Sequence, residues 1–143
     1  MTTEQISLVK QTFGLVAQLP AETVGSLFYA RLFFIAPEVK PLFARTTTPE
    51  QSRKLLTMLG YVIARLDRLD DVLDEVAQLA RRHVRYGVQD RHYTYVGEAL
   101  LDTLETGLGT VWTDDVRDAW VACYTLLASA MLAATDEAVP VTR

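Results

Sequence analysis

The chain has 143 residues, a formal net charge of −4 and a sequence pI near 5.1, and 50% of its residues are hydrophobic. A chain of this size is expected to form one domain, residues 1–143, with a substantial core. The acidic balance and the lack of a long basic run argue against nucleic-acid binding. Cys123 is the only cysteine, which excludes an internal disulfide and a zinc-binding thiolate cluster.

Membrane and export signals are weak in this sequence. The N-terminal stretch MTTEQISLVK lacks the apolar segment of a signal peptide. The most apolar run, residues 119–134, is too short to span a bilayer and contains Thr125 and Ser129. It predicts a helix buried on most of its circumference. We therefore expect no membrane insertion and a cytoplasmic protein.

The hydrophobic pattern is helical throughout. Nearly every long segment repeats apolar residues at steps of three and four, and none alternates cleanly as a strand does. This periodicity predicts an all-α protein. Helices with such broad apolar faces and short connections are expected to cross one another in ridge-into-groove packing rather than to form a simple four-helix bundle.

The first two predicted helices are separated by Pro20. Thr2 and Gln5 match a capping box, so the first helix should begin there and end near Leu19. Pro20 suits the first turn of the second helix, where a missing N–H group costs nothing. The predicted apolar face of the second helix consists of Val24, Leu27, Phe28, Leu32 and Ile35. The pairs Phe28–Tyr29 and Phe33–Phe34 widen it, so that two faces are expected to be buried.

The next segment contains a short turn and a third long helix. Pro37 and Pro41 exclude a long regular helix, so a short turn or a single-turn helix is expected, which should carry Phe43 inward. Thr48 is the expected N-cap of a helix with proline at its first position, running to about residue 66. A glycine within this helix, Gly60, suggests close approach of another helix. Residues 67–71 are expected to be a polar turn.

The stretch from Val72 to His83 places a histidine on an apolar helix face. Val72, Val76, Leu79 and His83 recur at steps of four, three and four. A buried imidazole needs a partner, which can be a hydrogen bond, a carboxylate or a metal. The alternative to a metal ligand is a core histidine bonded to a backbone carbonyl. Gly87 should end this helix in a left-handed cap.

Two further helices complete the predicted fold. The first covers residues 96–108, and the second starts at residues 113–115 and turns Val116, Trp120 and Cys123 inward. Residues from about Glu137 onward are expected to be a frayed tail.

Five sequence blocks resemble the globins, specifically the single-domain bacterial haemoglobins related to the haem domain of flavohaemoglobins. The similarity runs from about Thr3 to Ala134. It implies a globin fold, a crossed-helix sandwich of about six to eight helices around a haem pocket. It also implies haem b as cofactor and His83 as the axial ligand of the iron. The blocks are FYARLF (28–33), PEVKPLF (37–43), QSRKL (51–55), RRHVRYGV (81–88) and HYTYVGEALL (92–101).

On the His83 side of the haem, the resemblance implies that Tyr93 is the tyrosine that accompanies the histidine in this family. The family's glutamate in the last helix corresponds to Thr135, with Asp136 and Glu137 out of phase. This departure weakens the expected carboxylate push on His83, and with it any peroxidase-like or fast dioxygenase character.

On the opposite side, the resemblance implies that Tyr29 and Gln51 are the polar pair and Leu55 their apolar neighbour. A phenol and an amide both donate hydrogen bonds to a bound gas that carries partial negative charge. The alternative for Tyr29 is a core tyrosine bonded to a carbonyl. The alternative for Gln51 is a capping-box partner of Thr48.

Other residues are expected to contact the haem or its propionates. Phe43 should stack on the haem edge, although an ordinary core position is the alternative. Lys54 and His92 are the expected propionate partners, and Arg82 is a less well placed one. His92 is also a rival iron ligand, discounted because it lies in a polar corner. The remaining expected contacts, each of which is compatible with plain core packing, are Val76, Leu79, Val88, Val96, Leu100, Tyr124, Leu127 and Met131.

Three functions follow from this resemblance, and the sequence does not decide whether the protein is an enzyme. The first is reversible binding of dioxygen, with CO, NO and anionic ferric ligands as other ligands. The second is nitric oxide dioxygenation, which requires an unidentified external reductase because no reductase domain follows Met131. The third is a haem-free interaction module, which predicts loss of His83 and ranks last because His83 is present.

Overall fold

The computed structural model describes the backbone of residues 1–138 and the side chains of residues 1–135. Within this range the chain forms six α-helices and three 3₁₀ helices and no strand, which confirms the all-α prediction. In chain order the elements are α1 (Thr3–Val16), α2 (Ala21–Ile35), η1 (Pro37–Phe43), α3 (Thr48–Ile63), η2 (Leu66–Val72), α4 (Leu73–Arg85), α5 (His92–Leu108), η3 (Gly109–Val111) and α6 (Asp114–Ala138).

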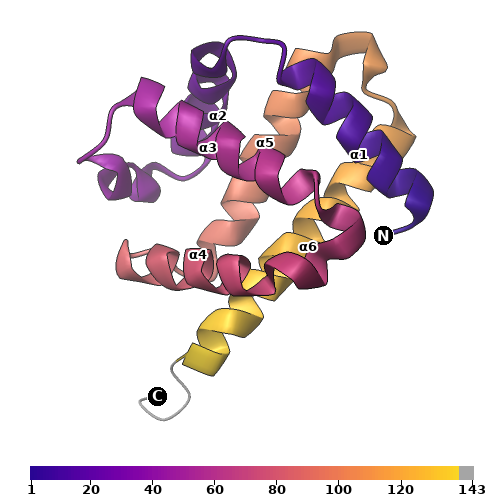
Figure 1. Cartoon of the computed structure of the whole chain (residues 1–143). Helices are drawn as coiled ribbons and strands as arrows, with labels where there is room; N and C mark the ends of the chain where they lie inside the picture. The colour runs from indigo at the N-terminus through magenta and orange to yellow at the C-terminus, as the bar shows by residue number, and fades with distance from the viewer. Residues whose placement is uncertain (139–143) are drawn as a thin grey trace.

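The helices cross one another in two layers. Helix α2 packs against α3 and α5, and both α1 and α4 pack against α6. Figure 1 shows α4 crossing α6, the helix against which it packs. Crossings of this kind come from ridges of side chains that fit into grooves, and they confirm the crossed-helix sandwich.

The core lies where α1, α2, α5 and α6 meet. Trp120 and Cys123 from α6, Leu32 from α2 and Val9 from α1 are all nearly inaccessible to solvent. The Trp120 indole Nε1–H donates to Thr12 Oγ1 at 2.9 Å, so the one polar group of this large side chain is satisfied inside the core.

Helix α2 shows where the expected burial was wrong. Phe28 and Leu32 are buried as predicted, but Leu27 is exposed and Phe34 is 77% exposed. The helix packs mainly against α3, α5 and η1, and Leu27 and Phe34 lie on a side that faces solvent. The aromatic pair Phe33–Phe34 therefore divides between core and surface, because neighbouring residues on a helix point about 100° apart.

Helix α6 is also less buried than the sequence predicted. Over Asp114–Thr135 it is long and apolar enough, by these two criteria alone, to cross a membrane, and 33% of that window is buried. Leu126 and Ser129 face solvent, while Trp120 faces the core. Packing against α1, α4 and α5 accounts for its apolar composition. The helix continues to Ala138, past the predicted start of the tail at residue 137; residues 139–143 lie outside the described part of the chain.

Several helix ends differ from the predicted ones by a residue or more. The Thr2–Gln5 capping box is present as predicted. Thr47, not Thr48, caps α3, because its side chain accepts from the Glu50 N–H. Residues 67–71 are not a polar turn but part of η2, whose two terminal residues are buried. This short helix connects α3 to α4.

The α2–α3 crossing contains a glycine, Gly25, that the sequence pattern did not mark. A Cβ atom on Gly25 of α2 would lie 1.7 Å from Ser52 Oγ of α3, so only glycine fits at this crossing. A Cβ on Gly60, by contrast, would meet only the Phe13 ring at 3.4 Å, which is ordinary contact. The α2–α3 crossing therefore depends on Gly25.

Candidate functional site

A cavity of about 620 Å³ separates α3 from α4. These two helices make few contacts with each other, and η2 packs against both. Its volume lies within the range of about 300–1,000 Å³ that is typical of small-molecule and cofactor sites. The apolar lining consists of Met58, Val62, Val72, Val76 and Leu79, and the polar rim of Glu50, Arg53, Lys54, Thr57, Tyr61, Glu75 and Arg82.

One end of the cavity is bridged by side chains from both helices. The Tyr61 hydroxyl of α3 donates to Glu75 Oε1 of α4 at 3.4 Å. The guanidinium of Arg65 lies 3.8 Å from the centroid of the Tyr61 ring. Lys54, which precedes Tyr61 in α3, and Arg82, which follows Glu75 in α4, also line the cavity. The cavity thus has an apolar interior and charged side chains at its edges.

His83 lies beside this cavity, one helical turn after Leu79. Its Nδ1 is 2.7 Å from the Leu79 carbonyl oxygen, which can only accept, so Nδ1 carries the proton and donates. Burial lowers the pKa of His83, partly opposed by this hydrogen bond. The half-buried ring is therefore neutral near pH 7, and its Nε2 presents a lone pair.

A neutral imidazole with a free Nε2 is the form that binds a metal. Among the described side chains, no hydrogen bond uses the Nε2 of His83. The sequence left open whether His83 is a ligand or a core histidine bonded to a carbonyl. The structure shows that the carbonyl contact uses only Nδ1, so this contact leaves Nε2 available and is compatible with either role.

The end of α4 holds His83 in place. Gly87 has φ +95°, the left-handed conformation that the sequence predicted. The Val88 N–H donates to the His83 carbonyl and the Gly87 N–H to the Val84 carbonyl, both at 3.0 Å. This is a Schellman motif, which satisfies the last carbonyls of the helix and fixes the backbone that carries the imidazole.

Tyr29 lies in an aromatic cluster formed by α2 and η1. Its ring centroid is 5.3 Å from that of Phe43 and 6.0 Å from that of Phe33. Burial raises the pKa of Tyr29 to about 12, and hydrogen bonding to the Gln51 side chain opposes part of this rise. The phenol is thus a protonated donor close to Gln51, and the two predicted polar residues come together.

Gln51 is not the capping partner that the sequence allowed. Thr47 caps α3, and the Gln51 backbone N–H donates to the Thr47 carbonyl at 3.0 Å as part of the helix. The amide side chain is therefore free to meet Tyr29. Leu55, one turn along α3, is half-buried and packs against the core, so it shares a helix face with Gln51 as predicted.

The start of α5 and the middle of α6 are joined by a tyrosine hydrogen bond. The Tyr124 hydroxyl donates to the Tyr93 carbonyl at 2.5 Å. A Cβ on Gly97 would lie 2.7 Å from the Tyr124 ring, so glycine allows this close packing. Burial raises the pKa of Tyr93. The Tyr124–Tyr93 hydrogen bond and the close packing of Gly97 on the Tyr124 ring together position α5 against α6.

Thr135 does not reproduce the role of a carboxylate. Its side chain is buried and its Oγ1 donates to the Leu132 carbonyl of its own helix at 2.8 Å. The side chains of Asp136 and Glu137 lie outside the described residues. No described carboxylate accepts from His83 Nδ1, whose partner is the Leu79 carbonyl.

His92 is more deeply buried than a polar corner suggests, with 5% of its surface exposed. The Gln89 N–H donates to its Nδ1 at 3.0 Å, so the ring proton is on Nε2. That Nε2 has no hydrogen-bond partner and lies 3.9 Å from Glu38 Oε2. Glu38 in turn accepts from Arg91 at 2.7 Å. These contacts connect η1 to the start of α5.

The other expected contact residues are spread over the same region. Lys54 and Leu79 line the cavity, whereas His83, Tyr29, Phe43, Gln51 and Leu55 do not. Met58 and Val62 are cavity residues that the sequence analysis missed, although their spacing of four from Lys54 is a signal. Leu100 is buried and the remaining predicted contacts, Val88, Val96, Tyr124, Leu127 and Met131, are half-buried.

The residues present fit a haem group. The cavity offers an apolar interior, and His83, one turn after the lining residue Leu79, offers a neutral imidazole nitrogen. Lys54 and Arg82 in the lining would supply positive charge for the propionates. Tyr29 and Gln51 offer hydrogen-bond donors, and Gln51 belongs to α3, the helix that forms one wall of the cavity. Together these groups supply an axial ligand, an apolar slot and a polar neighbour for a gas.

Comparisons with known proteins agree with this arrangement. The Globin family profile matches residues 26–131. The flavohemoprotein of Vibrio cholerae serotype O1 is 33% identical over 135 residues, which are 92% of this chain and 34% of that protein. The chain thus spans about a third of the length of this relative. Neuroglobin of Dissostichus mawsoni is 31% identical over 120 residues, 75% of this chain and 76% of that protein.

A solved structure extends the agreement to the whole fold. The bacterial globin from Campylobacter jejuni superposes with a TM-score of 0.85 and 26% sequence identity, covering 97% of this chain and 99% of that one. The resemblance seen in the sequence is therefore confirmed by profile, relatives and fold. On these grounds, the chain belongs to the globin family.

Proposed function

We propose that this protein reversibly binds dioxygen, and other diatomic gases, at haem iron ligated by His83 Nε2, in oxygen transport or storage. Membership of the globin family itself implies haem-based gas binding. The observation that carries the finer proposal is the Nδ1–H···O contact of His83 to Leu79 beside the α3–α4 cavity, since it leaves Nε2 as the donor atom.

The cofactor that we propose is haem b. Haem supplies an iron centre that binds diatomic gases. Covalent attachment of a c-type haem requires a C-x-x-C-H motif, whereas this chain has only Cys123, which is buried in the core. Retention of the haem therefore depends on His83, on the apolar lining of the cavity and on Lys54 and Arg82 at its edge.

Tyr29 and Gln51 are proposed to bind the gas ligand on the side opposite His83. Both side chains donate hydrogen bonds, and such donors stabilise a bound gas molecule that carries partial negative charge. Burial of Tyr29 excludes water from this contact and strengthens it. The single buried thiol of Cys123 is consistent with a reducing compartment, and we place the protein in the cytoplasm.

The proposal is tested by the visible spectrum of the protein reconstituted with haemin. We expect a stable ferric complex and, after dithionite and CO, a shifted Soret band characteristic of ferrous–CO haem. Free haemin at equal concentration is the control for non-specific binding. Absence of the shifted band would leave the haem-free interaction module as the better description.

Nitric oxide dioxygenation with an external reductase is the second candidate. The similarity to flavohemoproteins supports it. The hydrogen bond of Thr135 to its own helix, where a carboxylate was expected, favours the binding role instead. Stopped-flow mixing of the oxygenated protein with NO, together with turnover driven by a reductase, separates the two. Nitrate formation over many turnovers would make the protein a dioxygenase.

A further inference from the structure

The last turns of α4 carry an exposed group of positive and apolar side chains, here called the α4 patch: Arg81, Arg82, Val84, Arg85 and Tyr86. All five are exposed, with 48% of Val84 and 61% of Tyr86 accessible. The sequence holds no acidic residue between Glu75 and Asp90. The spacing of three and four residues places the arginines on adjoining faces of one helix end.

Within the part of the chain that the structure describes, the arginines of the α4 patch have no partner of opposite charge. Among the described residues, none of the three lies within 4.0 Å of a carboxylate, whereas Arg31 and Arg91 each pair with one at 2.6 and 2.7 Å. The whole chain has a net charge of −4, so the charge of the α4 patch is opposite in sign to the net charge of the protein. Unpaired, solvated arginines beside an exposed tyrosine have the composition of a protein interface.

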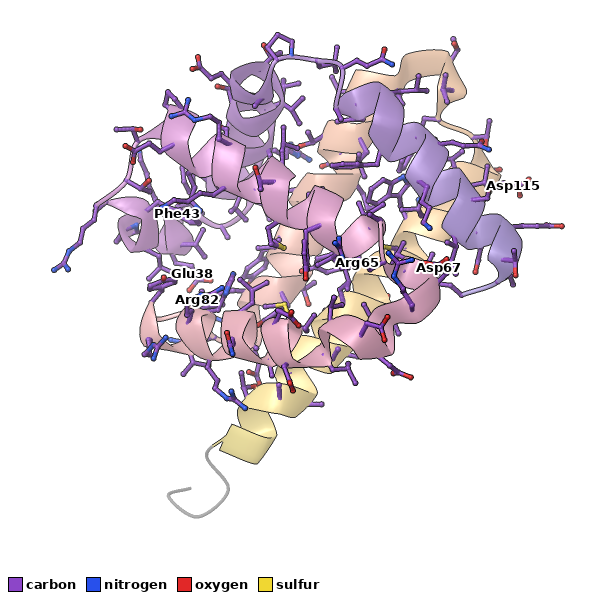
Figure 2. All side chains as sticks on the ribbon, in the orientation of Figure 1. Glu38, Phe43, Arg65, Asp67, Arg82 and Asp115 are labelled. Atoms are coloured by element: carbon purple, nitrogen blue, oxygen red, sulfur yellow. The ribbon has the colours of Figure 1, made fainter. Side chains whose placement is uncertain are left out.

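The α4 patch adjoins the candidate site. Arg82 lines the cavity, and the Tyr86 ring centroid lies 6.3 Å from that of His83. Figure 2 shows Arg82 on the same side of the molecule as Phe43 and Glu38, with Asp67 and Asp115 on the opposite side. Glu38, the labelled acid on the Arg82 side, is paired with Arg91. A protein bound at the α4 patch would therefore lie directly outside His83.

We propose that the α4 patch docks the acidic face of a flavoprotein that reduces the haem. This inference rests on the proposed function, because dioxygen binds ferrous haem, and iron that has been oxidised to the ferric state must regain an electron from a donor before it binds dioxygen again. In the step served by this complex, one electron passes from the reduced flavin of the donor to ferric haem iron, which becomes ferrous, and the donor is oxidised by one electron.

Electrostatics favours an acidic protein over an anionic membrane at this surface. Complementary charge accelerates association when it is concentrated near the contact, and it decays over a Debye length of about 8–10 Å at moderate salt. A small acidic surface can meet the α4 patch alone. A flat anionic bilayer also meets neighbouring acids such as Glu50 and Asp90, in a chain that is acidic overall.

The test uses the haemin-reconstituted protein and reduced flavodoxin, a small acidic flavoprotein, as the probe. The patch variant is the double substitution Arg81→Glu with Arg85→Glu, and Arg82 is kept because it lines the cavity. The matched control is Arg68→Glu with Arg117→Glu, which changes the net charge equally. Arg68 and Arg117 are exposed residues of η2 and α6, each 3.9 Å from a neighbouring carboxylate.

Two quantities are measured over a salt series: the affinity for flavodoxin, and the second-order rate of haem reduction. We expect the second-order rate of haem reduction at low salt to fall about tenfold in the patch variant, as for loss of electrostatic steering. In the control variant it should fall less than about twofold. High salt should remove the difference. Reduction by dithionite, a small molecule that needs no docking surface, should be equal in all three proteins.

Equal slowing of both variants, or a rate that does not depend on salt, would overturn the docking surface. So would binding to phosphatidylserine vesicles without binding to flavodoxin. Flavodoxin affinity is also measured by calorimetry on the haem-free protein. Because that measurement reports the α4 patch without haem, failure of the haem proposal and failure of the docking proposal give different results.

Discussion

At the scale of single residues, the imidazole of His83 is oriented by one hydrogen bond and a helix end. Nδ1 donates to the Leu79 carbonyl at 2.7 Å, and the Schellman motif at Gly87 fixes the backbone behind it. His92, the only other histidine, has its Nδ1 occupied by the Gln89 N–H and is held between η1 and α5. The two rings therefore have different expected roles.

We expect His83→Ala to lose haem and His92→Ala to keep it. The first substitution removes the proposed axial donor, whereas the second removes only a buried structural contact. Haem retention is measured per folded protein by gel filtration of the reconstituted variants, with circular dichroism as the control for folding. Equal retention by both variants would contradict the assignment of His83.

Tyr29→Phe should raise the oxygen dissociation rate by about 2- to 12-fold, as for loss of a hydrogen bond worth about 0.5–1.5 kcal/mol. Tyr95→Phe, which removes a hydroxyl from a tyrosine outside the lining of the cavity, is the matched control and should leave the rate unchanged. Stopped-flow displacement of oxygen by CO measures both. An unchanged rate in Tyr29→Phe would make Tyr29 a core residue only.

The effect of Tyr29 should be constant between pH 6 and about pH 10, since the pKa of Tyr29 is raised to about 12 and the phenol keeps its proton there. Above pH 10 an unfolded tyrosine releases its proton while the buried one does not. The unfolded state then binds fewer protons, so stability falls as pH rises from about 10 toward 12. Denaturant unfolding at pH 8, 10 and 11 measures this loss.

At the scale of helices, the α2–α3 crossing brings the predicted polar pair together. Tyr29 projects from α2 and Gln51 from α3, and Gly25 and Ser52 form the point of closest approach between these helices. The Ser52 hydroxyl donates to the Thr48 carbonyl at 2.6 Å, so no polar group is left unpaired at the contact. The geometry of the Tyr29–Gln51 pair thus depends on a glycine one turn away.

Gly25→Ala should destabilise the protein by about 1–3 kcal/mol, because its Cβ would overlap Ser52. At about 4 °C per kcal/mol, the expected decrease in Tm is about 4–12 °C. Gly14→Ala is the control: nothing lies within 4 Å of its Cβ position in α1, and it should gain up to about 1 kcal/mol of helix propensity. Calorimetry measures both, and an unchanged Tm for Gly25→Ala would show that the crossing adjusts freely.

At the scale of the whole molecule, α3 and α4 form the two walls of a cavity instead of packing together. Only Val76 and Ala80 of α4 are buried, and its main partner is α6. Helices α1, α2 and α5 share the closed core with α6. Local stability should therefore be lower in α4 than in the rest of the fold.

Haemin should stabilise the protein, and the effect should be largest in α4. A ligand that binds only the folded state adds about 2.7 kcal/mol at about 100 times its Kd. We expect a higher Tm and slower amide hydrogen exchange in α4, with little change in α1. Exchange followed by mass spectrometry with and without haemin measures this, and uniform protection of all helices would contradict a site between α3 and α4.

The sequence alone determined the features that depend on neighbouring residues along a helix. The all-α class, the Thr2–Gln5 cap, the Gly87 helix end and the position of His83 on an apolar face follow from steps of three and four residues or from backbone preferences. The family likewise followed from local motifs. Such features are readable because their partners lie within one or two turns.

The tertiary structure decided what depends on how helices cross. It placed Phe34 in solvent and Phe33 against Tyr29, buried His92, and made Gly25 the point of contact with Ser52. It also showed that α3 and α4 form the walls of a cavity, and that Arg81, Arg82 and Arg85 pair with no carboxylate of the described residues, unlike Arg91. Each of these depends on side chains from elements distant in sequence, whose relative orientation is set by packing and not by periodicity.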